Sequence, residues 1–276
     1  NALLLREHLE YHLAKYANEE KKDPARLNIV ITGGGFTGVE FAGELADRIP
    51  ELCREYDVEK TQIRIIIVER ESTILPDYEL DLINYAMNSL KSRGVEFIMN
   101  AEIVETSKDY VVYEKDGEQV QLPTKTVVWT AGVCGNSLLE KSGIETKNGK
   151  VEVNGDMRIP GMDDVYVVGD CARIINPETG NSFPSNIETA INSAVIATEN
   201  IKAQLRGQQP IHIQSNNRPM ITSLGSLDGI LMTKDGRKHF GWKAMFRKKL
   251  YYNWNLLRVG GINLLLKKGR FNIFGN

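Results

Sequence analysis

Short apolar segments alternate with longer segments of helical spacing through the first half of the chain. Runs of β-branched and aliphatic residues predict buried strands at residues 28–32, 63–69, 95–99 and 126–130. Helical spacing of apolar residues predicts helices at residues 3–20, 37–56 and 78–93. Pro50 lies inside the second of these helices and is expected to break it. Strands that alternate with helices predict a parallel sheet with right-handed crossovers.

The middle of the chain predicts an antiparallel hairpin, and the second half predicts further strands and a helix. Residues 109–122 alternate apolar and polar positions around Lys115-Asp116-Gly117, which predicts an antiparallel hairpin inserted into the parallel sheet. The second half predicts a strand at Val165–Val168, a helix at Ile187–Leu205 and a short β segment within Met220–Met232. The fold class is therefore α/β.

A glycine-rich loop joins the first strand to the next helix. Residues 33–38 read G-x-G-x-x-G, and in this position the motif is typical of dinucleotide binding, because exposed amides and the helix dipole favour a pyrophosphate. The candidate phosphate-binding residues are Gly33, Gly34, Gly35, Phe36, Thr37 and Gly38. A glycine-rich turn that binds nothing is the alternative.

Two carboxylates accompany this loop. Glu69 ends the next strand, where an acid accepts hydrogen bonds from ribose hydroxyls and repels a 2′-phosphate, so NADH is favoured over NADPH. Glu40 lies in the first turn of the helix after the loop. It either complements the helix dipole or lines a nicotinamide pocket, and both interpretations stay open.

The formal net charge of −2 hides a strong asymmetry along the chain. Ten of the 34 Lys and Arg, and none of the 36 Asp and Glu, lie between Arg237 and Arg270, so the remainder carries −12. Eight of the 21 aromatic residues lie between Phe240 and Phe274. The segment is rich in basic, aromatic and leucine residues, but its apolar runs are too short to span a bilayer. This combination is typical of a helix that lies in a membrane interface.

The residues expected to contact an anionic membrane surface are Trp242, Phe246, Lys248, Lys249, Tyr251, Trp254, Arg258, Lys267 and Lys268. A homodimer interface and a nucleic-acid-binding surface are the alternatives for this region. The leucines argue against nucleic acid, which has no need of so much aliphatic surface.

Cysteine usage limits the chemistry further. Cys53, Cys134 and Cys171 are odd in number and form no CxxC pair, so a zinc knuckle and a thioredoxin-type redox pair are excluded, and no metal site is expected. We expect buried, reduced thiols. The chain begins Asn1-Ala2 without methionine, and we expect the natural protein to extend upstream.

Several motifs occur in the order found in one enzyme family. The sequence resembles type II NADH dehydrogenase, the single-subunit NADH:quinone oxidoreductase of bacterial membranes. The motifs that carry this resemblance are Gly35-Phe36-Thr37-Gly38-Val39-Glu40, Trp129-Thr130-Ala131-Gly132-Val133, Val168-Gly169-Asp170-Cys171-Ala172 and Leu224-Gly225-Ser226-Leu227-Asp228-Gly229. The resemblance covers nearly the whole chain.

The resemblance implies a flavoprotein in which an NADH domain is inserted into an FAD domain. The implied fold is a Rossmann-type parallel sheet with an antiparallel hairpin excursion, a partial FAD-type α/β domain and a basic amphipathic C-terminal region. The corresponding segments are a connecting helix (1–27), the NADH domain (28–135), the C-terminal part of the FAD domain (136–209) and a membrane-associating region (210–276). The NADH site would include Ala131 and Gly132. Glu40 would be the catalytic residue beside the nicotinamide, and Gly169 and Asp170 would bind FAD.

Two departures from the family pattern modify these expectations. Only one glycine loop is present, so we expect FAD to bind only in the full-length protein, and the 276-residue chain to bind NADH weakly and to show little activity alone. At the expected acceptor site, formed by Ile187, Glu188, Ala190 and Asn192, only Ala190 agrees with the family motif. The acceptor is therefore a quinone or another electron acceptor.

The function expected from the sequence is electron transfer from NADH through FAD to a quinone, by a peripheral protein on the cytoplasmic face of the membrane. The alternatives are a related NAD(P)H-dependent flavin reductase with a non-quinone acceptor, and a non-catalytic nucleotide- or nucleic-acid-binding module.

Overall fold

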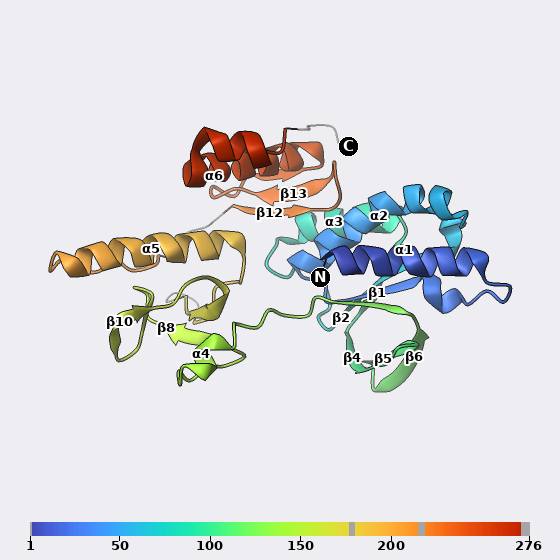
Figure 1. Cartoon of the computed structure of the whole chain (residues 1–276), viewed down its shortest axis with the longest axis horizontal. Coiled ribbons are helices and arrows are strands. Elements are labelled where there is room, and N and C mark those ends of the chain that lie inside the picture. Colours follow the sequence, from blue (N-terminus) through green and yellow to red (C-terminus); the bar gives the residue numbers. More distant parts are fainter. Residues whose placement is uncertain (1, 177–179, 215–218, 272–276) are drawn as a thin grey trace. The chain divides into compact units, whose positions relative to one another are not determined.

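The computed structural model describes residues 2–176, 180–214 and 219–271, so Phe274 lies outside the described residues. The chain divides into two units (Figure 1). Residues 1–131 together with 219–276 form unit 1, and residues 132–218 form unit 2. The C-terminal segment thus belongs to the same unit as the glycine loop.

A four-stranded parallel sheet lies at the centre of unit 1. Its strand order is β3-β2-β1-β7, with all three pairs parallel. The strands are β1 (Asn28–Thr32), β2 (Arg64–Glu69), β3 (Val95–Met99) and β7 (Thr126–Trp129). Each predicted strand is confirmed to within a residue, because a strand covered on both faces appears in the sequence as an unbroken apolar run.

The two faces of the sheet contribute to different hydrophobic cores. Alternate residues of β1 and β2 point to opposite sides. Ile29 and Ile31 pack into the core shared with the helices, whereas Val30, Ile66 and Val68 pack against an antiparallel sheet on the other face. All five positions of β1 are buried, and its β-branched residues Ile29, Val30 and Ile31 therefore serve both layers.

Three helices build the first core: α1 (Ala2–Asn18), α2 (Phe36–Tyr56) and α3 (Leu80–Ser92), with the short 3-10 turns η1 (Pro24–Leu27) and η2 (Lys60–Gln62) between elements. The expected break at Pro50 is wrong, since α2 continues through it. Ile49 and Leu52 on either side of the proline are both buried, and this packing outweighs the loss of one backbone hydrogen bond.

The antiparallel sheet has three strands: β4 (Ala101–Thr106), β5 (Tyr110–Lys115) and β6 (Glu118–Pro123). The predicted hairpin is confirmed. Its turn residues Asp116 and Gly117 both have positive φ, at 53° and 80°, as a tight two-residue hairpin turn requires. Strand β4 was not predicted, because a bulge between Ile103 and Glu105 interrupts its alternation.

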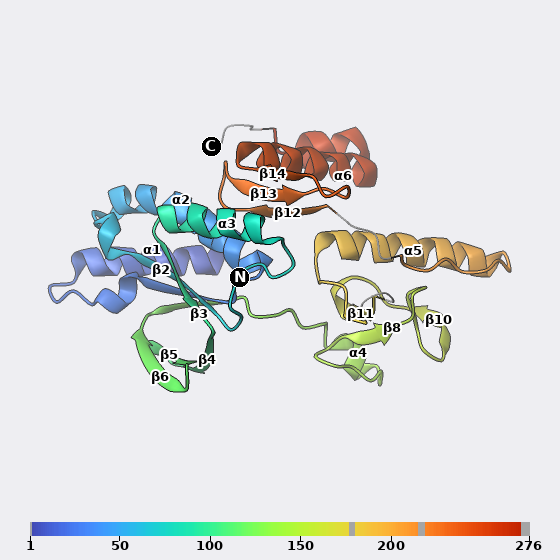
Figure 2. The ribbon, with the colours of Figure 1, turned by 180° about the vertical axis from the view of Figure 1, so that it is seen from behind.

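The C-terminal segment of unit 1 adds a second antiparallel sheet and a long helix. The elements are β12 (Met220–Ser223), β13 (Gly229–Met232), β14 (Lys238–Phe240) and α6 (Trp242–Lys268). Figure 2 shows this sheet over α2 and α3, with α6 on its other side. Gly43 of α2 permits the close approach, because a Cβ atom there would lie 2.3 Å from the carbonyl carbon of Leu224.

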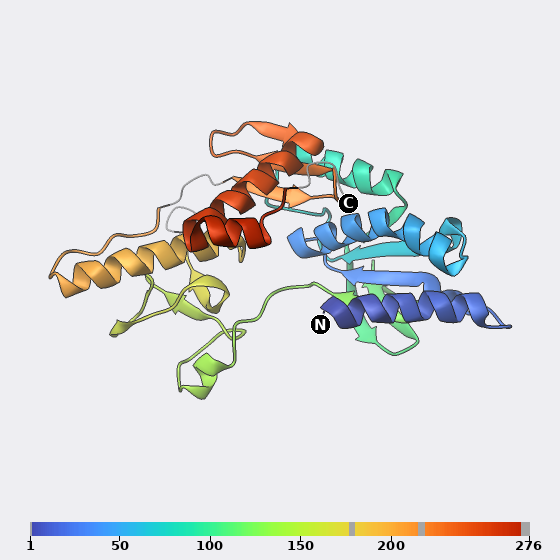
Figure 3. The ribbon, with the colours of Figure 1, turned by 45° about the horizontal axis from the view of Figure 1, so that its top comes forward.

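Helix α6 changes direction at Gly261, whose φ of 64° and ψ of −166° are not helical (Figure 3). The end of the helix returns to its own first half, where the Asn253 side chain exchanges two hydrogen bonds with the backbone of Arg270, at 2.8 and 3.0 Å. None of the helices in the described part of the chain has the length and apolarity needed to cross a membrane.

Unit 2 is a smaller α/β assembly. Strand β8 (Val151–Val153) pairs in parallel with β11 (Ala172–Ile174), and β9 (Arg158–Ile159) pairs antiparallel with β10 (Met162–Tyr166). The remaining elements are α4 (Leu138–Lys141), the 3-10 turn η3 (Gly169–Cys171) and α5 (Ile187–Leu205). Helix α5 has the predicted limits, and its Ile196 and Ala197 pack on Val151 and Ile174 in a separate core.

The strand predicted at Val165–Val168 is displaced by several residues. The turn at Gly161 folds β10 back onto β9, so the strand that forms is Met162–Tyr166. Val165 and Val168 are both exposed by more than a third. Pairing with β9, not apolarity, sets the limits of this strand.

Candidate functional site

The glycine loop of unit 1 lies where the ends of three parallel strands meet. Gly33 has a φ of +100° and donates its N–H to the carbonyl oxygen of Val68 at 2.8 Å. A Cβ atom on Gly33 would lie 3.2 Å from the Cα atom of Ala131. Both the positive φ and the close approach of the segment that follows β7 therefore favour glycine at this position.

Gly38 brings the first turn of α2 against the loop. A Cβ atom there would lie 2.0 Å from the carbonyl oxygen of Gly33. Thr130, which was not among the expected site residues, donates its hydroxyl to the carbonyl oxygens of Thr32 (2.6 Å) and Gly33 (3.2 Å). Its position immediately after β7 was the available signal, since residues at strand ends line such crevices.

Gly35 is the N-cap residue of α2, and apart from its own chain neighbours no atom of the described residues lies within 4 Å of the position its Cβ atom would occupy. No side chain caps the helix there, and the first-turn amides, including those of Phe36 and Thr37, have no partner within the helix. The open space, the free amides and the positive end of the helix dipole fit a phosphate group.

The Glu69 carboxylate faces this loop from the end of β2. It accepts hydrogen bonds from the N–H of Gly34 (2.5 Å) and the N–H of Glu71 (2.8 Å). Gly34 is also held by the N–H of Leu75, which donates to its carbonyl oxygen at 2.9 Å, and Ile74 leaves no room for a side chain on Gly34. The structure thus brings together the loop and the acid that the sequence placed 31 residues beyond its last glycine.

Glu40 is held by two groups from the C-terminal segment. Its carboxylate accepts a hydrogen bond from the N–H of Ser223 at 2.9 Å and forms an ion pair with Lys248 of α6. The Lys248 ammonium also donates to the Ser223 hydroxyl at 3.2 Å. Sequence reasoning did not find these partners, because they lie about 200 residues away along the chain.

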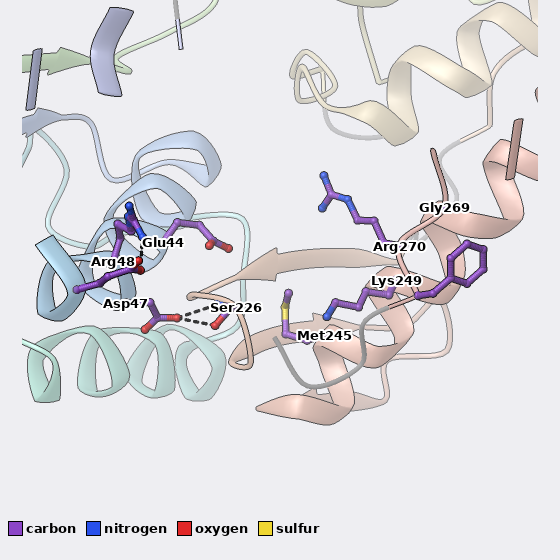
Figure 4. A pocket seen from close by; sticks show the side chains of 10 residues that line it. Glu44, Asp47, Arg48, Ser226, Met245, Lys249, Gly269 and Arg270 are labelled. Carbon is purple, nitrogen blue, oxygen red and sulfur yellow. Dashed lines mark hydrogen bonds and ion pairs between the residues drawn. The ribbon is translucent and has the colours of Figure 1, made fainter. Parts of the chain in front are cut away.

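A cleft of about 630 Å³ opens one turn further along α2 (Figure 4). Glu44 and Asp47 of α2 lie on one side of it, and Lys249 and Arg270 on the other. Burial raises the pKa of the Glu44 carboxyl, and the nearby Asp47 adds to the effect. The Asp47 carboxylate accepts hydrogen bonds from the backbone and hydroxyl of Ser226, which ties α2 to the β12–β13 turn.

The first part of α6 carries an exposed apolar row at helical spacing. Trp242, Phe246, Leu250 and Trp254 follow one another at intervals of four residues, and the two tryptophans are 60% and 59% exposed. Of the other expected membrane residues, Arg258, Lys267 and Lys268 are exposed, and Lys249 and Tyr251 are partly exposed. Lys248 differs from them, because its ammonium is engaged with Glu40.

Unit 2 brings the expected FAD residues beside the expected acceptor helix. Gly169 donates its N–H to the hydroxyl of Ser193 on α5 at 3.1 Å, and a Cβ atom on Gly169 would contact Ala190 at 3.8 Å. The side chain of Asp170 is exposed. Ser193 was not among the expected site residues, although it lies one turn beyond Ala190, as a neighbour on the same helix face should.

The other expected residues of unit 2 lie at the surface or near it. Ile187, the first residue of α5, is 69% exposed, whereas Glu188 and Asn192 are partly buried. Asn186 caps this helix by accepting the N–H of Thr189 at 2.8 Å. Gly132 is exposed and has a φ of +92°.

The expectation of buried thiols is correct only in part. Cys53 is buried, Cys171 is partly buried and Cys134 is exposed. Cys134 lies in the segment that leaves β7, which has no regular secondary structure to cover it. The described residues include no group of three His, Cys, Asp or Glu arranged to hold a metal ion.

Comparison with known proteins identifies relatives of the chain. Residues 6–199 match the family described as pyridine nucleotide-disulphide oxidoreductase. Two curated relatives, the type II NADH:quinone oxidoreductases of Staphylococcus saprophyticus and Staphylococcus aureus, are each 39% identical over 267 residues. The match covers 97% of this chain and 66% of each relative, so the chain spans just under two thirds of their length.

Solved structures share the fold at low sequence identity. An NDH2 of Plasmodium falciparum in complex with NADH is 16% identical, with a TM-score of 0.81 over 96% of this chain and 70% of that chain. The sulfide:quinone oxidoreductase of Aquifex aeolicus is 17% identical, with a TM-score of 0.67 over 89% of this chain and 59% of that chain.

Proposed function

Because the chain belongs to the pyridine nucleotide-disulphide oxidoreductase family, we propose that it supplies the NADH-binding part of a flavoprotein that transfers electrons from NADH to a quinone. The curated relatives named type II NADH:quinone oxidoreductase, at 39% identity over nearly the whole chain, support this reaction. The observation that carries the proposal is the open N-terminus of α2 at Gly35, beside the Glu69 carboxylate.

NADH would bind across the ends of β1, β2 and β7. The pyrophosphate would lie over Gly35, where the free amides of α2 donate to it and where no side chain intrudes. Glu69 would accept hydrogen bonds from the adenine ribose, exchanging its present bond to Gly34 for bonds to the hydroxyls. Its negative charge disfavours the 2′-phosphate of NADPH.

Glu40 would lie at the nicotinamide end of the bound NADH. It follows the phosphate loop by a short stretch of the same helix, and its bonds to Ser223 and Lys248 hold the carboxylate in one orientation. Such a group orients the nicotinamide ring; the hydride transfer itself belongs to the cofactors.

The residues of unit 2 fit part of a flavin site. The exposed Asp170 carboxylate is available to hydroxyl groups of the FAD ribityl chain, and the absence of a side chain on Gly169 leaves room above Ala190. FAD, when bound, supplies the isoalloxazine ring that accepts a hydride from NADH and returns the electrons to the acceptor. The protein's part is to bind and orient these groups.

The acceptor would meet the flavin near the first turns of α5. The exposed Ile187 offers an apolar contact suited to a quinone ring, and Asn192 offers an amide. A second candidate is a flavin reductase with a different acceptor. It is favoured by this same helix, where only Ala190 matches the family's quinone motif.

A membrane surface is the proposed partner of α6. The row from Trp242 to Trp254 exposes aromatic and aliphatic side chains, and the exposed Arg258, Lys267 and Lys268 supply positive charge. Aromatic and basic residues on one helix suit the interface of an anionic bilayer. This arrangement supports peripheral attachment to a membrane, and the proposed location is its cytoplasmic face. The Lys248 ammonium is engaged with Glu40.

The phosphate site is tested by two substitutions at Gly35. Asp and Asn are both good N-cap residues, so Gly35→Asp and Gly35→Asn should each leave the free energy of unfolding unchanged or slightly higher. Only the aspartate places a negative charge against the pyrophosphate. In a fluorescence titration with NADH, we expect Gly35→Asp to weaken binding at least roughly 10-fold more than Gly35→Asn. Equal affinities for the two variants would contradict the proposed site.

The reaction is tested with the full-length protein, supplied with FAD, NADH and a panel of quinones. Stopped-flow absorbance follows flavin reduction by NADH and flavin reoxidation by each quinone as separate phases. Reduction without reoxidation by any quinone would favour the second candidate. Binding to DNA without any NADH-dependent flavin signal would instead support a nucleic-acid-binding module.

A further inference from the structure

Two of the three cysteines belong to segments of unit 2 that are in contact with each other. Cys134 lies in the exposed segment after β7, and Cys171 ends the 3-10 turn η3. The backbone N–H of Asn136 donates a hydrogen bond to the Sγ atom of Cys171 at 3.4 Å. The residue two positions after Cys134 therefore touches the second thiol, although 37 positions separate the two cysteines.

The chain between them limits their separation. Since consecutive Cα atoms are about 3.8 Å apart, the Cα atom of Cys134 lies within roughly 10 Å of the Cys171 sulfur. A disulfide needs a Cα–Cα distance of about 4.4–6.8 Å. Bond formation would need the exposed segment that holds Cys134 to bring the two Cα atoms within this range.

The two sides of Cys134 differ in how firmly they are held. Gly135 donates its N–H to the carbonyl oxygen of Asn148 at 3.0 Å, and a Cβ atom on it would lie 1.8 Å from the carbonyl oxygen of Gly149. This contact holds the segment against the turn at Asn148 and Gly149. Gly132, by contrast, is exposed, and in the described part of the chain no atom beyond its two neighbours lies within 4 Å of where its Cβ would be. Cys134 thus lies within roughly 10 Å of the Cys171 sulfur, on a segment that is held on one side and exposed on the other.

We propose that Cys134 and Cys171 are a peroxide-sensitive thiol pair that forms a reversible disulfide. The exposed Cys134 thiol loses its proton and the thiolate attacks a hydroperoxide; the O–O bond breaks, the leaving oxygen takes up the proton, and a sulfenic acid and one water (or alcohol) are formed. The Cys171 thiol then attacks that sulfur, the S–S bond forms, the S–O bond breaks and water leaves. The two thiols together lose two electrons, and the peroxide accepts them.

The third cysteine is a built-in control. Cys53 is buried in α2, and burial raises the pKa of its thiol, so it has little thiolate at neutral pH. It should react with neither peroxide nor an alkylating agent while the chain is folded.

The disulfide would lie next to Asp170, the residue proposed to contact FAD. Oxidation is therefore expected to lower flavin affinity, and this consequence rests on the proposed function. Formation of the disulfide does not rest on the proposed function, because it needs no bound flavin and is detected directly by peptide mapping.

The test is peptide mapping of the full chain after treatment with hydrogen peroxide and alkylation of the remaining thiols. Trypsin places the three cysteines in separate peptides, at residues 126–141, 159–173 and 49–54. We expect the first two to be joined, with the loss of two hydrogen atoms, and to be released by a dithiol reductant. Cys53→Ser should keep the link, and Cys134→Ser or Cys171→Ser should abolish it.

Either of two results would overturn the proposal. One is full alkylation of the peptides at 126–141 and 159–173 after peroxide treatment. The other is a link found only in the dimer band of a non-reducing gel, which would mean that the thiols of different chains react. Circular dichroism of each serine variant establishes that the absence of a link does not come from unfolding.

Discussion

The carboxylate of Glu40 in α2 and the ammonium of Lys248 in α6 form an ion pair that joins residues 208 positions apart. Both side chains are about two thirds buried, with 34% and 29% of their surfaces exposed. The pair connects the helix that begins at the glycine loop to the basic C-terminal segment. It explains why a residue that the sequence assigned to a membrane surface lies at the proposed nicotinamide end of the site.

The ion pair should make a measurable contribution to stability. We expect Lys248→Met and Glu40→Gln each to lower the free energy of unfolding, and a double-mutant cycle to give a coupling energy of about 1 kcal/mol, since the pair is neither fully exposed nor fully buried. Urea unfolding measures all four proteins. Lys243→Met, an exposed lysine one turn earlier on α6, is the control and should change little. A coupling energy of zero would show that the contact is not formed in solution.

Gly38 and Gly35 should respond differently to the same substitution. Gly38→Ala puts a methyl group 2.0 Å from a backbone oxygen, so we expect a loss of about 3 kcal/mol or more in the free energy of unfolding. Gly35→Ala enters open space at an ordinary φ of −72° and should cost about 1 kcal/mol or less. Chemical denaturation compares the two. Similar losses would mean that the loop is packed differently.

Glu69 should govern the choice between the two nicotinamide cofactors. Glu69→Gln keeps a hydrogen-bond acceptor but removes the charge that repels a 2′-phosphate. We expect the ratio of the NADPH and NADH dissociation constants to fall roughly 10-fold, which corresponds to about 1.4 kcal/mol. Fluorescence titrations with both cofactors measure this ratio. If it is unchanged, Glu69 does not face the ribose.

His12 should make the stability of unit 1 depend on pH. Burial, with His8, Arg26 and Lys125 nearby, lowers the pKa of His12 from 6.5 to about 4. Its Nδ1 atom accepts a hydrogen bond from Arg26 at 2.9 Å, which requires the neutral ring. Between pH 6.5 and 4 the unfolded chain therefore binds the extra proton, and stability falls as the pH is lowered through this range.

The variant that tests this dependence is His12→Asn, whose amide oxygen can still accept a hydrogen bond from Arg26 but does not titrate. Urea unfolding at several pH values should give a shallower loss of stability between pH 6.5 and 4 for the variant than for the wild type. Parallel curves would assign the acid sensitivity to other groups.

The exposed basic residues of α6 should control binding to anionic vesicles. Changing Arg258, Lys267 and Lys268 together to Gln is expected to weaken co-sedimentation roughly 100-fold at low salt, at roughly 1 kcal/mol for each charge. The same number of charges removed at the exposed Lys21, Lys108 and Lys141 is the matched control. Equal losses in the two triple variants would indicate a general charge effect and not a membrane-binding surface.

The sequence by itself determined the parallel sheet, the glycine loop and helix α5. These features depend on local signals: unbroken apolar runs for strands covered on both faces, glycines where φ is positive or backbones touch, and helical spacing with a capping Asn186. Each signal is contained within a few consecutive residues. The same locality placed Glu69 correctly at the end of its strand, facing the loop.

Only the tertiary structure decided features that depend on distant partners. Packing of the buried Ile49 and Leu52 lets α2 continue through Pro50. Pairing with β9 shifts the strand that the sequence predicts at Val165–Val168. The ion pair with Glu40 accounts for the partly buried position of Lys248. The contact between Asn136, two residues after Cys134, and the Cys171 thiol likewise arises from the fold of unit 2. Long-range contacts of this kind leave no mark in the spacing of neighbouring residues, because the free energy that selects them comes from surfaces that meet only after folding.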